Sequence, residues 1–194
     1  GTISLMLTAV NDMPEVENDT AMGTEDTAVT INVLSNDTDI DGTLDVATVV
    51  FESPPSGASL SADGKILTVP NEGVWSVNST TGDIVFTPED NFNGETTEVQ
   101  YTVDDNLGLT SDVATINVSL DEENDKPVLV NDTAAGTEDI PVTINVLGND
   151  SDVDGALDVT SVVFVNPPSG ASLSSDRKTL IVPSEGAWRI SPTG

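Results

Sequence analysis

The stretch from Val29 to Gly42 reads VTINVLSNDTDIDG, and it recurs from Val142 to Gly155 as VTINVLGNDSDVDG. Its first half alternates apolar and polar residues, which is typical of a β-strand with one buried face. Its second half places three aspartates at alternate positions before a glycine. Carboxylates that lie this close repel one another unless a hard cation gathers their oxygens. The stretch therefore predicts a strand followed by a calcium-binding loop.

The aspartate loop does not form a complete EF-hand. An EF-hand needs a bidentate glutamate at position 12, and this position is Thr48 in the first copy and Ser161 in the second. Further ligands must come from elsewhere in the fold or from the next repeat. The alternative is a solvated acidic hairpin loop, but two copies with one spacing favour a metal site. The predicted loop ligands are Asp37, Asp39 and Asp41 in the first copy and Asp150, Asp152 and Asp154 in the second.

The two copies belong to a longer internal repeat. The offset of 113 residues that carries Val29 onto Val142 also carries Trp75 onto Trp188 and the sequence PPSGASL at Pro54 onto its copy at Pro167. A match over so many residues indicates an array of similar domains. We interpret residues 1–12 as the last strand of a preceding repeat plus a linker, 13–125 as a complete β-sandwich repeat, and 126–194 as a truncated second β-sandwich repeat.

The apolar residues of the complete repeat follow a period of two, and turn clusters rich in Gly, Pro, Asn and Asp separate the apolar runs. About seven short strands in a repeat of this size indicate an all-β fold of tandem Ig-like or cadherin-like antiparallel β-sandwich domains. The strand Ile3–Leu7 is left without a repeat of its own, and we predict that it pairs with the truncated repeat of a neighbouring molecule. Within the complete repeat, the expected strands cover residues 29–33, 46–51, 66–69, 84–87, 99–103 and 114–120.

The composition is strongly acidic, with 34 acidic and 5 basic residues and a formal net charge of −29. Nucleic acid and anionic membranes are implausible partners because both are bound through Lys and Arg. We expect self-repulsion to oppose compactness until cations bind. The chain has no cysteine, no apolar run reaches the length of a membrane span, and no signal peptide opens the sequence. We read it as the interior of a longer protein.

Acidic and amide side chains also collect at the expected ends of the sandwich, where linkers and loops meet. Calcium takes six to eight oxygen ligands, and such ends can supply them from several segments at once. These additional groups are the linker pairs Asn11-Asp12 and Asn124-Asp125, the pairs Glu25-Asp26 and Glu138-Asp139 near the start of each repeat, and Asp104-Asp105 after the strand at 99–103.

Residues 101–111, 114–118 and 124–127 resemble the last two strands and the calcium linker of cadherin-like repeats. The Asn-Asp-Thr, Thr-Glu-Asp-Thr and aspartate-loop signatures are similar to the tandem repeats of giant bacterial RTX-type surface adhesins. The resemblance covers nearly the whole chain, although the glycine-rich nonapeptides of RTX proteins are absent. It implies an extracellular calcium-binding extender module that holds an adhesive tip away from the bacterial cell surface, with neighbouring repeats of the same chain as its partners.

The resemblance also implies which oxygens bind Ca²⁺. Asn11 and Asp12 would join the first aspartate loop, and Asn124 and Asp125 would join the second. Two alternatives stay open: Glu25-Asp26 also fits a solvated turn, and Asp45 and Asp158 either reach the same ion or face solvent. The lower-ranked candidate ligands are Glu25, Asp26, Glu138, Asp139, Asp104 and Asp105.

An enzyme is not expected, because the absence of His and Cys removes the common nucleophile systems and transition-metal sites. A glycosidase with two carboxylates would need an aromatic-lined cleft that this chain offers little material to build. Two non-catalytic classes remain, a calcium-stiffened spacer and a module that binds a glycan or a protein directly. Near-identity between the copies favours the spacer. Trp75 and Trp188 are expected to pack rather than to stack on sugars.

Overall fold

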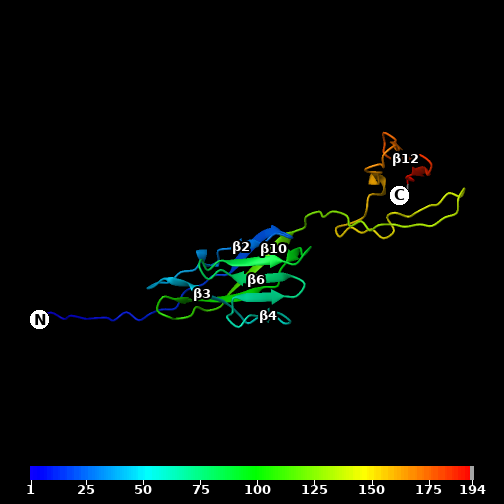
Figure 1. Cartoon of the computed structure of the whole chain (residues 1–194). Coiled ribbons are helices and arrows are strands. Elements are labelled where there is room, and N and C mark those ends of the chain that lie inside the picture. Colours follow the sequence, from blue (N-terminus) through cyan, green and yellow to red (C-terminus); the bar gives the residue numbers. More distant parts are fainter. Residues whose placement is uncertain (193–194) are drawn as a thin grey trace. The chain divides into compact units, whose positions relative to one another are not determined.

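The computed structural model describes residues 1–192 and divides the chain into two compact units, Gly1–Glu123 and Asn124–Gly194. Figure 1 shows unit 1 from blue to green and unit 2 from yellow to red. Among the described residues, no helix has the length and the apolar character needed to cross a membrane.

Unit 1 is a β-sandwich made of two five-stranded sheets. In the first sheet the order is β1-β10-β9-β3, and β8 pairs with β10; in the second the order is β2-β7-β6-β5-β4. The second sheet consists of β2 (Val29–Ile31), β7 (Ile84–Pro88), β6 (Gly73–Val77), β5 (Ile66–Val69) and β4 (Ser59–Leu60). The first sheet consists of β1 (Asp19–Thr24), β10 (Ala114–Asp121), β9 (Val99–Asp105), β3 (Leu44–Glu52) and β8 (Gly94–Glu95).

The core of unit 1 lies between these sheets because alternate residues of both point inward. In β10 the odd and even positions alternate between partly exposed and buried residues, as expected for a strand with one buried face. Trp75 from β6 is fully buried and its ring centroid lies 4.5 Å from that of Phe86 in β7. Tyr101 and Phe51 complete the core from the opposite sheet. The predicted class, a tandem β-sandwich, is confirmed. Trp75 packs as expected, but its copy in unit 2, Trp188, is 49% exposed, so the expected packing of Trp188 is not found.

One strand pair departs from the antiparallel expectation. β1 pairs in parallel with β10 over six residues, from Asp19 opposite Ile116 to Thr24 opposite Asp121. Parallel strands cannot be joined by a tight turn, and the rest of the sandwich forms the connection between these two. Gly23 allows close packing here, because a Cβ at this position would lie 2.5 Å from a methyl group of Val29.

Unit 2 contains the 3₁₀ turn η2 (Val159–Ser161) and a three-stranded antiparallel sheet in the order β11-β12-β13. The strands are β11 (Ser172–Leu173), β12 (Thr179–Val182) and β13 (Gly186–Arg189). Residues 142–147, which repeat a strand of unit 1, form no strand in unit 2. In unit 1 the last part of the matching stretch is also not strand, since Val33–Ser35 form the 3₁₀ turn η1.

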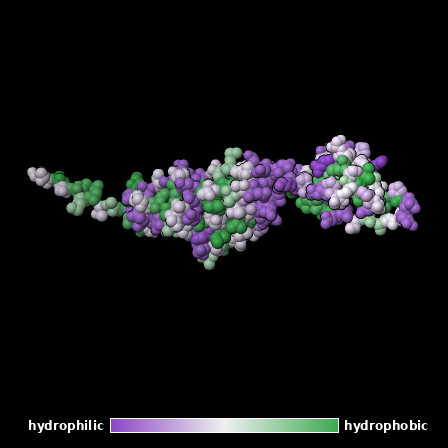
Figure 2. All heavy atoms as spheres, turned by 45° about the horizontal axis from the view of Figure 1, so that its top comes forward, coloured by the Kyte–Doolittle hydropathy of each residue, from purple (hydrophilic) through white to green (hydrophobic). Residues whose placement is uncertain are grey.

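The N-terminal residues 1–13 form no strand, so the predicted strand at Ile3–Leu7 has no partner strand among residues 1–192. Their apolar side chains are exposed, and Figure 2 shows this segment as a run of hydrophobic surface. Its pairing with a second molecule remains a prediction.

Candidate metal site

The first aspartate loop lies alongside the segment that leads into the sandwich. Glu15 and Thr38 form an isolated antiparallel bridge, in which each N–H donates to the other carbonyl at 2.8 and 2.9 Å. On either side of this bridge, the N–H of Asp12 donates to Asp41 Oδ1 at 3.3 Å and the N–H of Glu17 donates to Asp37 Oδ1 at 2.8 Å. We call residues 11–17 the leading segment. Its contacts place the linker residue Asp12 beside Asp41, the last aspartate of the loop.

Asp39 has one oxygen fixed by the backbone and one without a partner. Its Oδ1 accepts hydrogen bonds from the N–H of Asp41, at 3.1 Å, and from the N–H of Gly42. Its Oδ2 is buried and makes no hydrogen bond. A buried carboxylate oxygen normally accepts a hydrogen bond. Burial removes the water that would otherwise bind it, and without another donor the free energy of that hydration is lost.

Asp105, at the end of β9, brings a third segment to the same place. Its Oδ1 accepts from the N–H groups of Leu107 and Leu109 at 2.8 and 2.9 Å, and its Oδ2 accepts from the Asn11 amide at 2.5 Å. The other side-chain atom of Asn11, Oδ1, is buried and unpaired. The next residue, Asn106, accepts from the N–H of Thr43 at 2.8 Å, which holds the β9–β10 turn against the aspartate loop.

These hydrogen bonds also determine the charge state of Asp105. Burial alone would raise the pKa of this carboxyl group. The N–H of Leu109, the Asn11 amide and the N–H of Leu107 lower it more strongly, so its pKa falls below the ordinary value. Asp105 is therefore an ionised group at neutral pH, although only 2% of its surface is exposed.

We call Asn11, Asp39, Asp41 and Asp105 the oxygen cluster. Within residues 1–192, no group of three or more Asp, Glu, His or Cys side chains converges into a metal-binding group by itself. A site here must therefore combine carboxylates with the Asn11 amide. Its donors are all oxygens, as Ca²⁺ prefers, and two of them, Asn11 Oδ1 and Asp39 Oδ2, are buried without a partner. In the chemistry of their donor atoms, the residues present fit a calcium ion.

Unit 2 repeats the contacts of the aspartate loop. The N–H of Asp125 donates to Asp154 Oδ2, the N–H of Asp154 donates to Asp152 Oδ1 at 3.1 Å, and the N–H of Val130 donates to Asp150 Oδ1 at 2.7 Å. Asn124 donates through its side chain to the carbonyl of Asp125 at 2.8 Å. The aspartate loop thus makes equivalent contacts in both units, with the linker aspartate held on the last aspartate of the loop.

Asp37 lies apart from the oxygen cluster. Its Oδ2 is 3.2 Å from the hydroxyl group of Tyr101, which also donates to Asp19 Oδ2 at 2.8 Å. Asp37 is buried and Asp19 is half-buried beside the same phenol, and burial raises the pKa of each. Since its oxygens are bound to Tyr101 and Glu17, Asp37 positions the loop, and we leave it and its copy Asp150 out of the proposed ligand set.

Asp104 and Asp105 are neighbours on β9 and therefore point to opposite faces. Asp104 receives the hydroxyl of Thr110 at 2.6 Å and is not brought to the oxygen cluster. Asp45 and Asp158 bind local groups: Asp45 accepts from the N–H of Ala47 at 3.0 Å and Asp158 accepts from the N–H of Thr160 at 2.8 Å. Both side chains are exposed, Asp45 on β3 and Asp158 directly before the 3₁₀ turn η2, which agrees with the solvent-facing alternative.

Glu25 is at the opposite end of unit 1, after β1. It is buried, with Oε2 accepting from the Asn93 amide at 3.0 Å and Oε1 accepting from the N–H of Glu123 at 2.7 Å. This carboxylate holds the chain where it leaves β10, so a solvated turn does not describe it. Its neighbour Asp26 is exposed and accepts from the N–H of Asn91 at 2.8 Å. In unit 2, Glu138 and Asp139 are both exposed.

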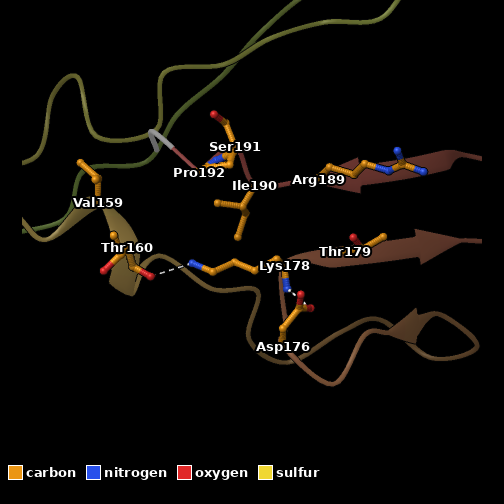
Figure 3. A pocket seen from close by; sticks show the side chains of 9 residues that line it. All are labelled: Val159, Thr160, Asp176, Lys178, Thr179, Arg189, Ile190, Ser191 and Pro192. Carbon is orange, nitrogen blue, oxygen red and sulfur yellow. Dashed lines mark hydrogen bonds between the residues drawn. The ribbon is translucent and has the colours of Figure 1, made fainter.

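Asn106 links the β9–β10 turn to the aspartate loop. The sequence places it among the amide groups that directly follow Asp104-Asp105, but it is not among the predicted ligands. The hollow in unit 2 lined by Lys178, Arg189 and Ile190 is a different feature (Figure 3). It contains one carboxylate, Asp176, and no second acidic group, so it offers no cation site.

A β-sandwich with carboxylate and amide loops gathered at one end is typical of the extracellular repeat modules of surface proteins. Two family comparisons agree with this class. A model described as a bacterial cadherin-like domain matches residues 11–122, and one described as a bacterial Ig domain matches residues 124–193. The chain therefore belongs to the bacterial cadherin-like domain family. A search of curated proteins found no match.

Domains of these two families are typically structural or adhesive modules of bacterial surface proteins, and cadherin-like domains generally bind Ca²⁺. The match to unit 1 begins at Asn11, the first residue of the oxygen cluster. The resemblance to RTX adhesins in particular is not addressed by these matches and stays a prediction.

Proposed function

We propose that this chain is an extender of a bacterial cell-surface adhesin, in which Ca²⁺ bound by the oxygen cluster fixes each repeat to the segment that precedes it. The neighbouring repeats of the same protein are its partners, and any surface glycan or protein ligand is bound by other domains. The observation that carries the proposal is the pair of buried, unpartnered oxygens, Asn11 Oδ1 and Asp39 Oδ2, in a cluster that contains only oxygen donors.

The cluster joins three segments that are far apart in the sequence and are held together only by non-covalent contacts. Asn11 comes from the leading segment, Asp39 and Asp41 come from the loop before β3, and Asp105 comes from the end of β9. A bound Ca²⁺ supplies two positive charges that several carboxylates share. The protein residues then hold the leading segment against two loops of the sandwich, and bending at Asn11 requires breaking that attachment.

Backbone hydrogen bonds prepare this arrangement before any ion binds. One oxygen of Asp39 and one of Asp105 are held by N–H groups, which fixes the orientation of both carboxylates. Little side-chain entropy is then lost on binding. A site with a Kd of about 10⁻⁴ M, in the range of weak extracellular calcium modules, would be well occupied at millimolar calcium.

The test is calcium titration by calorimetry on the 194-residue chain and on Asp39→Asn. Asparagine keeps the size of the side chain but removes the charge of the unpartnered oxygen, so we expect the affinity of the unit 1 site to fall at least tenfold. Glu98→Gln is the matched control, since it removes one negative charge from an exposed residue away from the cluster. An unmodified chain that takes up no calcium, or an Asp39→Asn chain that binds like Glu98→Gln, would refute the proposal.

A further inference from the structure

β3 is the last strand of its sheet. One side of it pairs with β9, and among the described residues no strand pairs with its other side. An edge of this kind presents free N–H and C=O groups, which invite pairing with a strand of another molecule. β3 is nine residues long, so the edge would be a large template. Its free groups belong to alternate residues, because successive peptide groups of a strand point to opposite sides.

In unit 1 a lysine occupies this edge. The ammonium group of Lys65 donates to the carbonyl of Ala47 at 2.8 Å and to the carbonyl of Val49. The N–H of Phe51, two residues further, donates to the carbonyl of Gly64 at 2.8 Å. Residues 47, 49 and 51 are the alternate positions of β3, and each has a group bound by the residue pair 64–65. A partner strand would have to displace these contacts.

Unit 2 contains the same arrangement. Lys178 donates to the carbonyl of Thr160 at 2.8 Å, as Figure 3 shows, and to the carbonyl of Val162. The N–H of Phe164 donates to the carbonyl of Arg177 at 3.0 Å, and Arg177 Nε donates to the Phe164 carbonyl at 3.1 Å. The contacts form although residues 162–165 are not in a strand of unit 2. They therefore depend on the turn and the lysine rather than on a finished sheet.

A serine-aspartate turn orients the lysine in both units. In unit 1, Ser61 donates to Asp63 Oδ1 at 2.5 Å, and the N–H of Lys65 donates to the same oxygen at 3.2 Å. In unit 2, Ser174 donates to Asp176 Oδ1 at 2.5 Å and the N–H of Lys178 donates to it at 3.0 Å. The chain has only three lysines, and two of them hold this position.

We propose that Lys65 seals the free edge of β3, which follows the aspartate loop of unit 1, and prevents it from pairing with the same edge of a second copy of this chain. Lys178 makes the equivalent contacts in unit 2, where no strand forms at these residues. The partner that the Lys65 contact excludes is a second molecule of the same chain. Two such molecules carry the same edge strand, and two identical edges can pair antiparallel about a two-fold axis. The acidic net charge of −29 opposes such contacts only at long range and is screened by salt. The lysine acts at the hydrogen-bonding groups themselves.

The contacts between the Lys65 ammonium group and the two carbonyls have an electrostatic cost, which distinguishes them from an ion pair on the open surface. Burial lowers the pKa of Lys65, while Asp63 and Asp45 act in the opposite direction. A side chain that keeps its charge in a partly buried place, in order to bind two carbonyls, is a frequent device for blocking sheet edges. It is independent of calcium, so its failure and the failure of the proposed function are separate results.

The test is sedimentation velocity of the 194-residue chain with Lys65→Met, in chelator and at physiological salt. Methionine keeps the length of the side chain and removes its donors. We expect self-association at least tenfold tighter than that of the unmodified chain. Lys126→Met is the matched control, because it removes one positive charge from an exposed linker residue. Lys65→Arg, which keeps the charge and the donors, should behave like the unmodified chain.

A folded Lys65→Met chain that self-associates no more than Lys126→Met would overturn the proposal. Circular dichroism reports whether the variant is folded. If it is not, amide hydrogen exchange on the unmodified chain decides: the N–H of Phe51 should be protected at the level of the paired strands, and exchange at the rate of an open peptide would overturn the proposal.

Discussion

Asp37 and Asp39 are two residues apart in one motif, yet their surroundings differ completely. Asp37 shares the hydroxyl group of Tyr101 with Asp19, whereas Asp39 keeps one buried oxygen free. A phenol has one proton and cannot donate to both carboxylates at once. Burial raises the pKa of Asp19 and Asp37, and their mutual repulsion adds to this for Asp37. The two carboxylates therefore weaken the fold when both are ionised.

Asp37→Asn should stabilise the chain at pH 7, because its amide can donate to the Tyr101 oxygen while its carbonyl keeps the N–H of Glu17. One added hydrogen bond is worth about 1 kcal/mol of unfolding free energy. A folded-state pKa above the unfolded value means that protonation of Asp37 contributes stability below the unfolded pKa and loses it as pH rises through the folded pKa. The advantage of the variant should therefore be largest at pH 7 and shrink on acidification towards pH 4.

Chemical denaturation of both chains across this pH range, in chelator, measures the difference. Asp105 changes in the opposite sense, since its lowered pKa contributes stability that is lost as pH falls below the ordinary carboxyl range. It is common to both chains and cancels in the comparison. A constant difference between the two chains from pH 7 to pH 4 would contradict the raised pKa of Asp37.

The sequence could predict that the aspartate loop gathers oxygens, but not which of its members does so. In one dimension Asp37, Asp39 and Asp41 are equivalent. Two features of the fold give them different surroundings. One is the bridge between Glu15 and Thr38, and the other is Tyr101, which lies 64 residues away from Asp37 in the sequence. The choice of Asp105 over Asp104 is likewise decided by which face of β9 lies towards the leading segment, which depends on the pairing of the strands.

At the scale of elements, the aspartate loop and the β9–β10 turn approach each other closely at Gly42, which has no side chain. A Cβ at this position would lie 2.6 Å from Asn106 Oδ1 and 2.9 Å from Asp39 Oδ1. The copy of this residue in unit 2, Gly155, has no atom within 4 Å of such a Cβ. The two glycines occupy equivalent positions in the repeat, so the same substitution at each compares a crowded site with an open one.

Gly42→Ala should lower the unfolding free energy of unit 1 by about 1–3 kcal/mol, the usual cost of overpacking. It should also weaken calcium binding in unit 1 at least tenfold, because the loop can no longer close on the turn. Gly155→Ala should change neither the unit 1 transition nor its calcium affinity. Thermal unfolding and calorimetry measure both effects, and equal behaviour of the two variants would show that the contact with Asn106 does not matter.

Most of the strands with clear alternation were predictable from sequence. The expected strand at 114–120 is β10, that at 66–69 is β5, and that at 84–87 is β7. The sequence did not predict β1 or its parallel pairing, because Asp19–Thr24 has no apolar alternation and acquires its register only from β10. It also did not predict β6, whose residues include Trp75 and begin at a glycine. Strands that depend on a partner far along the chain lack a local signal.

At the scale of the whole molecule, the charge of −29 makes the folded state sensitive to ions in two different ways. Any salt screens the repulsion between exposed carboxylates. Only a cation that binds the oxygen cluster can also join the leading segment to the loops of unit 1. These contributions differ in concentration dependence, since screening follows ionic strength and specific binding follows the occupancy of a site.

Removing calcium should therefore lower the melting temperature of the chain, and an equal ionic strength of sodium chloride should not restore it. A site filled to 100 times its Kd contributes about 2.7 kcal/mol to the unfolding free energy. That contribution is a large fraction of the stability of a small domain, which is about 5–15 kcal/mol. The radius of gyration from small-angle scattering should rise in chelator, because the attachment at Asn11 is then lost. The Asp39→Asn chain should show a smaller response to calcium in both measurements. If sodium chloride alone reproduced the melting temperature and the radius of gyration found with calcium, screening would explain the behaviour and the oxygen cluster would have no part in it.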